Sequence, residues 1–207
     1  LVTRFIDGRP IAVAAMGSPS VLPRIAEALR KLHSAPAIPG RFDAHAVVEL
    51  YRAEAEANGV EVPSDFAAAW EVSERIRSAR GPQPLVPCHN DLLNANFLDD
   101  GAILIVDWEY AGMGDRFFDL ANFSVNHDFS VEDDRRLLAA YFGAERVADL
   151  ASLRLMRFMS DFREAMWGVL QSGISELDFD FKGYAAKHFD RMKRTSSNPV
   201  FERYLRS

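Results

Sequence analysis

The sequence predicts a mainly α-helical α+β domain over residues 1–207, with a few short strands near its middle. Two observations lead to this fold class. Apolar residues recur at intervals of three or four over most of the chain, as they do in amphipathic helices. Residues 85–106 instead contain short apolar runs separated by turn residues, which is typical of strands. Neither an internal repeat nor a low-complexity linker divides the sequence, so we expect a single domain.

The first part of the chain is predicted to be helical. Apolar residues at helical spacing over residues 22–33 predict a first helix. Asp43 is suited to cap a second helix that stops at Gly59, because Asp favours helix starts and Gly favours helix ends. A third helix is expected over residues 64–80, where a Gly-Pro pair follows.

Short apolar runs come next and predict strands. They cover residues 85–88, 97–98 and 103–106. Asp100 and Gly101 separate the last two runs and are typical of a hairpin turn. The predicted strands therefore enclose a polar loop.

The rest of the chain returns to helix after Asp115. Ser130 and Asp133 have the spacing of a capping box, in which each side chain bonds the backbone of the other residue. Apolar periodicity then continues almost to the end of the chain. The helices predicted in this part cover residues 131–142, 144–171 and 184–193, and a tail is expected from residue 196 onward.

Composition and charge narrow the choice of partners. With 30 acidic and 24 basic residues the net charge is -6, and no run of Lys and Arg offers a nucleic-acid site. A small cationic molecule suits this balance better. The single cysteine, Cys88, excludes an internal disulfide and fits a reducing compartment. Because no apolar run is long enough to span a membrane and residues 1–10 lack signal-peptide features, we expect a cytoplasmic protein without membrane contact.

The polar loop and the strand after it carry residues that suit phosphoryl transfer. That reaction needs magnesium, aligned phosphates and a carboxylate that orients the attacking hydroxyl. Asp91 can accept the hydroxyl's hydrogen bond, although a reference pKa of about 3.9 makes it a weak base. Mg²⁺ prefers oxygen ligands, and Asn96 and Asp107 offer an amide oxygen and a carboxylate. The predicted hairpin would return Asp107 to the end of the loop that carries Asn96.

Each of these residues also has an ordinary structural interpretation. Asp91 or Asn94 could cap local backbone in a turn, His89 could be a structural histidine, and Asp107 could simply end a strand. Taken singly, these interpretations are preferable. Their occurrence together, in this order and between strands that would bring them side by side, favours a common site.

The motif H-N-D-x-x-x-x-N at residues 89–96, followed by V-D-W-E-Y at residues 106–110, resembles a known kinase signature. It is similar to the catalytic and metal-binding segments of the choline/ethanolamine kinase and aminoglycoside phosphotransferase superfamily, distant relatives of protein kinases. Residues 1–8 resemble the segment that joins the two kinase lobes, and residues 28–33 resemble the following helix. Residues 161–191 are similar to the carboxy-terminal helices of choline kinases. The resemblance implies a protein-kinase-like carboxy-terminal lobe.

The resemblance also implies roles for individual residues. Asp91 falls on the catalytic carboxylate, and Asn96 and Asp107 fall on the residues that hold Mg²⁺. His89 matches an architectural histidine of the loop. Asp119, in the segment DLAN, matches an aspartate that braces the catalytic loop through its backbone. Mg²⁺ as cofactor and ATP as co-substrate follow from these matches.

The resemblance to choline kinases suggests the acceptor. A quaternary ammonium group cannot donate a hydrogen bond, so a site for it uses aromatic faces, each contributing about 0.5–2 kcal/mol. Tyr110, Trp167 and Tyr184 match positions that line the choline pocket in the family. Aromatic residues at helical spacing are otherwise more often part of a core, which is the alternative interpretation.

Two acidic residues could add charge to the same pocket. Asp161 and Glu164 lie three apart on the helix that carries Trp167, so they share a face of that helix. We therefore expect them to be candidate carboxylates for the cation. A solvated acidic face is an equally good interpretation.

The phosphate-binding parts of such kinases are missing from the sequence. A complete kinase of this type has an amino-terminal lobe with a Gly-rich loop and a strand Lys. Here G-x-G occurs only at residues 112–114, and the first Lys is Lys31, inside a predicted helix. We expect a carboxy-terminal lobe without its amino-terminal lobe, which binds choline weakly and turns over poorly or not at all. The apolar residues around 1–6 would then be uncovered and favour self-association, for example as a homodimer.

These observations favour an ATP-dependent phosphotransferase that acts on the hydroxyl of a small amino alcohol. Choline, converted with ATP to phosphocholine and ADP, is the first candidate acceptor, and ethanolamine is the related one. An aminoglycoside or other small-molecule phosphotransferase is the alternative, which would need a wide acidic groove instead of an aromatic cage. A third hypothesis is a non-catalytic lobe that acts as a binding or dimerisation module.

Overall fold

The structure, a computed structural model, describes residues 8–207. Two expectations concern the start of the chain: a junction between two lobes at residues 1–8, and an apolar surface around residues 1–6. Residues 1–7 are outside the described part of the chain, so both expectations remain untested.

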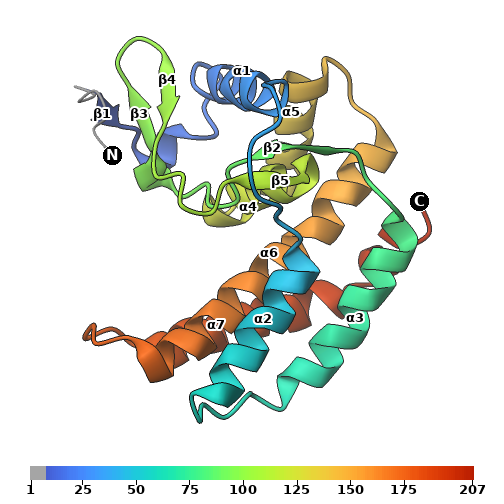
Figure 1. Ribbon diagram of the computed structural model, residues 1–207. Coiled ribbons are helices and arrows are strands. Elements are labelled where there is room, and N and C mark those ends of the chain that lie inside the picture. The colour runs from blue at the N-terminus through green and yellow to red at the C-terminus, as the bar shows by residue number, and fades with distance from the viewer. Residues whose placement is uncertain (1–7) are drawn as a thin grey trace.

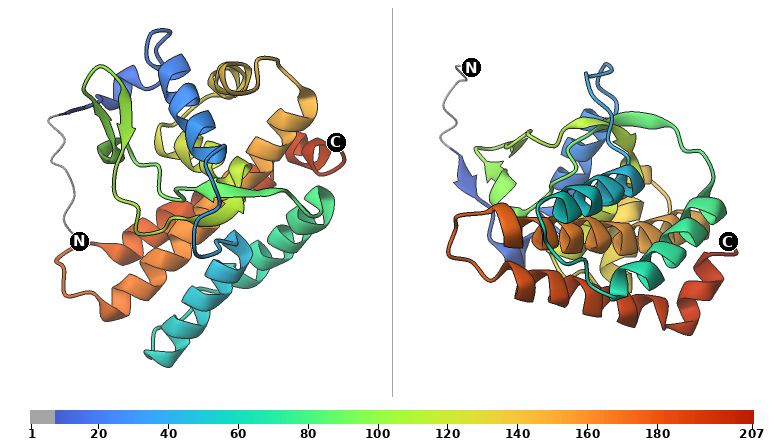
Figure 2. Two further views of the ribbon diagram at one scale, coloured as in Figure 1. Left: turned by 45° about the horizontal axis from the view of Figure 1, so that its top comes forward. Right: turned by 60° about the horizontal axis from the view of Figure 1, so that its bottom comes forward.

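The long helix α6, Val147–Ile174, is the element against which most other helices pack. Its residues are buried on nearly every side between Leu150 and Leu170, because apolar residues occur all around the helix and not on one stripe. The helices α2 (Ala44–Ala57), α4 (Arg116–Asn126) and α7 (Phe181–Ser196) contact it. Figure 1 shows α6 crossing the molecule, and the right view of Figure 2 shows α6 between α2 and α7.

The predicted helices of the first part are confirmed. Helix α1 is Leu22–His33 and packs on α5, and α3 is Asp65–Arg80. Asp43 caps α2, since its carboxylate accepts hydrogen bonds from the backbone N–H groups of the next turn. Gly81 ends α3 with a φ of 59°, a left-handed value that Gly adopts without strain.

Short antiparallel strands lie next to α1 and α4. Strands β3 (Phe97–Asp99) and β4 (Ile103–Ile105) form the predicted hairpin, and β1 (Arg9–Pro10) pairs with β3. In a second sheet, β2 (Leu85–Cys88) pairs with β5 (Gly112–Asp115). The sheets thus hold both ends of the polar loop, which runs from β2 to β3.

Strand β5 was not predicted, because the letters G-M-G-D do not form an apolar run. Its glycines have a packing reason. A Cβ atom on Gly112 would lie 3.2 Å from the backbone N of Phe42, and one on Gly114 would lie 3.2 Å from the Phe42 carbonyl oxygen. The strand is therefore set by close backbone contact with the segment before α2.

The last part of the chain agrees with prediction at α5 and differs at the carboxy-terminal end. Helix α5, Val131–Phe142, begins with the expected capping box of Ser130 and Asp133. The expectation of a tail from residue 196 was wrong: Asn198 caps a further short helix, α8 (Pro199–Tyr204), by accepting a hydrogen bond from a backbone N–H group. The buried side chain of Phe201 holds α8 against the rest of the molecule.

The predicted fold class, α+β with mainly helices, is confirmed. Among residues 8–207, none of the helices combines the length and apolar character that crossing a bilayer requires.

Candidate active site

The loop between β2 and β3 is held in an uncommon backbone conformation. Asn90 has a φ of 69°, in the left-handed region that non-Gly residues seldom adopt. Such strain persists only where surrounding contacts enforce it. Here Leu92 is buried, and its backbone N–H donates to Oδ1 of Asn122, 2.6 Å away.

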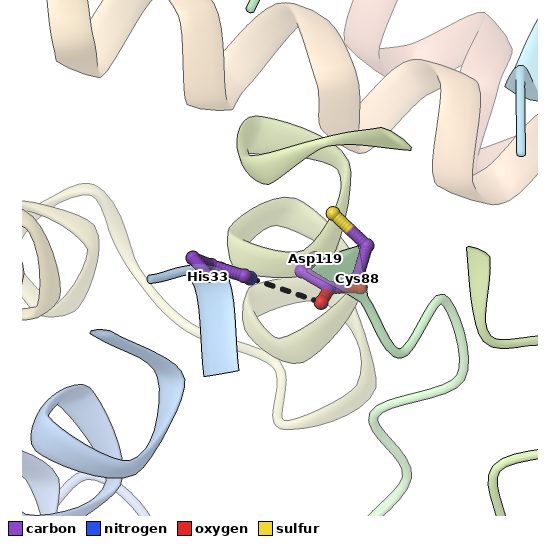
Figure 3. Close-up of side chains that lie close together, drawn as sticks. All are labelled: His33, Cys88 and Asp119. Atoms are coloured by element: carbon purple, nitrogen blue, oxygen red, sulfur yellow. Dashed lines mark hydrogen bonds and ion pairs between the residues drawn. The ribbon is translucent and has the colours of Figure 1, made fainter. Parts of the chain in front are cut away.

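Asp119 of α4 supplies the main contacts of this loop. Its carboxylate is fully buried and accepts hydrogen bonds from the backbone N–H groups of His89 (2.8 Å) and Asn90 (2.7 Å). Nε2 of His33, at the end of α1, lies 3.1 Å from the same carboxylate. Figure 3 shows this contact between α1 and α4. The buried charge is therefore satisfied by hydrogen bonds, as burial of a carboxylate requires.

Cys88 lies beside these two side chains, and metal-ligand atoms of His33, Cys88 and Asp119 all lie within 4.8 Å of one another (Figure 3). Their other contacts explain the cluster without a metal. Both ring nitrogens of His33 have partners, since Nδ1 lies 2.7 Å from the Tyr141 hydroxyl. Burial raises the pKa of the Cys88 thiol, which keeps it protonated and a poor ligand. We interpret the cluster as a brace for the loop.

His89 connects the loop to the segment that carries Asp107. Its Nε2 donates to the carbonyl oxygen of Val106 at 2.9 Å, and its Nδ1 accepts from the backbone N–H of Asp91 at 3.3 Å. These two bonds together select the neutral tautomer with the proton on Nε2. The backbone N–H of Val106 also donates to the carbonyl of Asn96 at 3.0 Å. The residue before Asp107 is thus bonded to both ends of the loop.

Asn96 and Asp107 offer oxygen atoms that fit a hard cation. Nδ2 of Asn96 donates to the Asp91 carbonyl at 2.8 Å, so the amide Oδ1 is the atom left for another partner. Asp107 is exposed and has a φ of 68°. Among residues 8–207 no ion pair involves its carboxylate. An amide oxygen and an unpaired carboxylate next to the same loop are suitable ligands for Mg²⁺.

Asp91 is half-buried, with 14% of its side chain exposed. Burial raises the pKa of its carboxyl group, and the nearby Arg163 guanidinium opposes that rise. Nη2 of Arg163 lies 3.2 Å from Oδ1 of Asp91. Within the described part of the chain, Oδ2 of Asp91 accepts no hydrogen bond from protein.

The predicted aromatic residues lie together next to Glu164. The rings of Trp167 and Tyr184 have centroids 5.7 Å apart, and the Tyr184 hydroxyl donates to Oε2 of Glu164 at 2.6 Å. Burial raises the pKa of the Tyr110 hydroxyl, and the charge of Arg163 and, less strongly, the Trp167 side chain oppose that rise. The Arg163 guanidinium lies over the Tyr110 ring, 5.2 Å from its centroid. These aromatic side chains therefore adjoin the network that reaches Asp91.

The carboxylate of Asp161 makes its hydrogen bonds with His188 and Arg191 of α7. Nδ1 of His188 lies 2.8 Å from its Oδ1, and Nε of Arg191 donates to both of its oxygens, at 2.8 and 2.9 Å. With only 2% of its surface exposed, this carboxylate is already neutralised within the α6 and α7 pair. Of the two predicted carboxylates on α6, only Glu164 contacts the aromatic group.

Sequence reasoning missed Arg163 and Tyr51. Burial raises the pKa of the Tyr51 hydroxyl of α2 to about 12, and the charges of Arg163, Tyr110 and Glu164 act on it. Tyr51 is therefore a further aromatic neighbour of the group. The sequence offered one signal for Arg163, its position next to the candidate Glu164.

The chain is similar to known proteins over most of its length. The family model described as phosphotransferase enzyme family matches residues 1–156. Ethanolamine kinase 1 of Homo sapiens is 27% identical over 236 residues, which covers 92% of this chain and 51% of that protein. Ethanolamine kinase 1 of Mus musculus is 30% identical over 161 residues, 63% of this chain and 44% of that protein. The chain spans about half the length of these curated relatives.

Solved structures with the same fold cover almost the whole chain. A choline/ethanolamine kinase family protein from Mesorhizobium loti is 35% identical with a TM-score of 0.88, over 98% of this chain and 72% of that one. Choline kinase LicA from Streptococcus pneumoniae matches with a TM-score of 0.75 and 20% identity, over 91% of this chain and 67% of that one. At that identity the second likeness concerns the fold alone. The predicted kinase-like fold is thereby confirmed.

Proposed function

Because this chain belongs to the phosphotransferase enzyme family, we propose that it transfers the terminal phosphoryl group of ATP to the hydroxyl of a small amino alcohol. The observation that carries this proposal is the link between the two halves of the site. Arg163 contacts Asp91 on one side and Glu164 on the other, and Glu164 bonds Tyr184 of the aromatic group. A carboxylate for the hydroxyl and an aromatic group for the cation thus belong to one network.

In the proposed reaction Asp91 accepts a hydrogen bond from the acceptor hydroxyl and orients its oxygen toward the phosphoryl group. Orientation is its main task, since bond formation to the phosphoryl group is late in most phosphoryl transfers. Asn96 and Asp107 would hold Mg²⁺, which when bound neutralises charge on the phosphates. The hydrogen bonds of Asp119 and His89 hold the loop with Asp91 and the segment before Asp107 in fixed positions.

The acceptor would be bound by its positive charge. The rings of Tyr110, Trp167 and Tyr184 suit a cation by their electron-rich faces, and Glu164 adds a carboxylate. Choline is our first candidate, because residues 161–191 resemble the carboxy-terminal helices of choline kinases. Ethanolamine is the second, because the curated relatives named above are ethanolamine kinases. We place the reaction in the cytoplasm, where ATP is available.

The ATP phosphates need further groups. Since the sequence contains neither the glycine loop nor the strand lysine of complete kinases, we propose that residues 1–207 alone bind the acceptor but transfer phosphate poorly. Self-association of the chain, for example as a homodimer, is also a proposal. Light scattering on the purified chain tests it, and a monomer at all concentrations would contradict it.

The test of the function is a panel of acceptors. The protein, with any sequence that precedes residue 1 in its gene, is incubated with ATP, Mg²⁺ and choline, ethanolamine or kanamycin, and ADP release is measured. We expect acceptor-dependent turnover with choline or ethanolamine. Turnover with kanamycin alone would contradict the proposal and favour an aminoglycoside phosphotransferase. Absence of turnover with all acceptors would favour a non-catalytic binding module.

A further inference from the structure

Arg163 is a cation in the interior of the molecule, with only 2% of its side chain exposed. A buried guanidinium is costly unless charges and hydrogen-bond acceptors surround it. Burial alone would lower the pKa of Arg163, yet the carboxylates of Glu164 and Asp91 more than offset that effect and the group stays charged. A charge kept in this position at such cost calls for an explanation.

The contacts of Arg163 all lead to the candidate site. Nη2 donates to the carbonyl oxygen of Asn90, the residue with strained backbone before Asp91, and pairs with Oδ1 of Asp91 itself. Nη1 lies 2.9 Å from Oε1 of Glu164. That N–H is not directed at the oxygen, so the contact is an ion pair without a hydrogen bond. The guanidinium carbon lies over the ring of Tyr110, 5.2 Å from its centroid.

Another arginine on α6 shows that an arginine in this helix need not make such contacts. Arg154 pairs with Asp134 of α5 at 2.9 Å, and Asp134 is bonded to Ser124 of α4. These contacts tie helices together and involve no residue of the loop or the aromatic group. Arg163 and Arg154 therefore offer, on one helix, a comparison between a role in the site and a role in packing.

We propose that Arg163 is a positioning residue, which fixes the Asn90 carbonyl and one oxygen of Asp91 so that the other oxygen of Asp91 faces the acceptor hydroxyl. This inference rests on the proposed function. The planar guanidinium can contact the loop with one nitrogen and Glu164 with another, which a lysine ammonium cannot reproduce in the same geometry. Through Glu164 and Tyr184 the same residue ties the position of Asp91 to the aromatic group proposed for the cation.

The charges of the network suit an acceptor with one positive charge. Asp91 and Glu164 are acidic and Arg163 is basic, so these residues together leave one negative charge. A monocationic amino alcohol would complete the balance. Binding of that cation depends mainly on Glu164 and the aromatic rings, whereas the orientation of Asp91 depends on Arg163. Removal of Arg163 should therefore affect turnover more than acceptor binding.

The test compares Arg163→Gln and Arg163→Lys with Arg154→Gln in the acceptor-dependent assay. We expect Arg163→Gln to lower kcat about 100-fold with KM for the amino alcohol changed less than about threefold, because misplacement of a reacting group costs about this much. Arg163→Lys should recover part of the loss and stay about tenfold below wild type. Arg154→Gln should keep the wild-type kcat.

Wild-type kcat in both Arg163 variants, or a rise in KM with kcat unchanged, would overturn the proposal. If Arg163→Gln does not fold, Arg163→Lys carries the test, because it keeps the charge and loses only the fork geometry. A second readout needs no activity. Hydrogen exchange of residues 88–97 should become faster in the Arg163 variants than in Arg154→Gln. Unchanged exchange would contradict the proposal that Arg163 fixes the loop. Absence of turnover in the wild type would instead count against the proposed function.

Discussion

At the scale of single residues, the site depends on how burial and neighbours alter ordinary side chains. Asp91 in water would be an unremarkable carboxylate, but here burial raises its pKa and Arg163 opposes the rise. Arg163 also holds one oxygen of the carboxylate. A carboxylate in this state is suited to orient a hydroxyl without binding it too strongly.

Replacement of Asp91 tests this role. Asp91→Asn keeps the shape of the side chain and removes its charge and its ability to accept the hydroxyl proton. We expect kcat to fall by about 10²–10⁴-fold, the usual contribution of such a group. Steady-state kinetics with the preferred acceptor measure the effect. Asp100→Asn, in the exposed hairpin turn, is the control and should keep wild-type kcat. Equal rates for both variants would contradict the assignment.

The sequence indicated the polar residues of the loop as candidates, because their types and spacing match what phosphoryl transfer requires. It was not sufficient for Arg163 or Tyr51. Their neighbours are distant in sequence, and 72 positions separate Arg163 from Asp91. Asp161 illustrates the opposite case: helical spacing placed it on a face with Glu164, but contacts with α7 engage it in another ion pair.

At the scale of elements, the loop is held by helices that lie outside the reaction. The carboxylate of Asp119 connects α4 to the loop and, through His33, to α1. The hairpin and its Asp-Gly turn were predictable from local sequence. Strand β5 was not, because backbone packing against the segment around Phe42 determines it and its side chains do not.

Asp119→Asn tests this brace. An amide offers one acceptor oxygen in place of two, and its NH₂ group would face a backbone N–H donor. We expect the free energy of unfolding to fall by about 3–5 kcal/mol, the cost of disrupting a buried charged network. Denaturant unfolding measures it. Asp180→Asn is the control, because Asn also caps helices well and α7 should keep its cap. A loss below about 1 kcal/mol would refute the brace.

The start of α2 should make stability depend on pH. Burial, reinforced by the charge of Arg77, lowers the pKa of His45 to about 4. The unfolded chain, with an ordinary His pKa of about 6.5, therefore binds more protons between pH 4 and 6.5, so stability falls as pH falls through that range. From pH 7 to pH 5 this group should account for about 2 kcal/mol of the loss.

The comparison variant is His45→Gln, which cannot take up a proton. Its free energy of unfolding is measured at pH 7 and pH 5. The decrease between these pH values should be smaller than that of the wild type by about 2 kcal/mol. Identical decreases in both proteins would show that His45 does not stay neutral in the folded state.

At the scale of the whole molecule, the site lies where two groups of elements meet. The strands, α1 and α4 hold the loop with Asp91 and Asn96, while α6 provides Glu164 and Trp167 and α7 provides Tyr184. Figure 1 shows these two groups of elements. The fold class could be predicted because helical and strand periods occupy separate stretches of sequence. The contact between the two groups could not be predicted. It depends on the buried Arg163, which the local sequence pattern does not distinguish from a surface arginine.

The most direct test follows the phosphoryl group itself. The protein, together with any sequence encoded before residue 1, is mixed with ATP, Mg²⁺ and choline or ethanolamine, and ³¹P NMR records the products. The account predicts that ADP and a phosphate monoester of the alcohol appear in equal amounts with the wild type, and that Asp91→Asn forms both at least about 100-fold more slowly. Inorganic phosphate without the ester, or equal ester formation by the Asp91 variant, would contradict it.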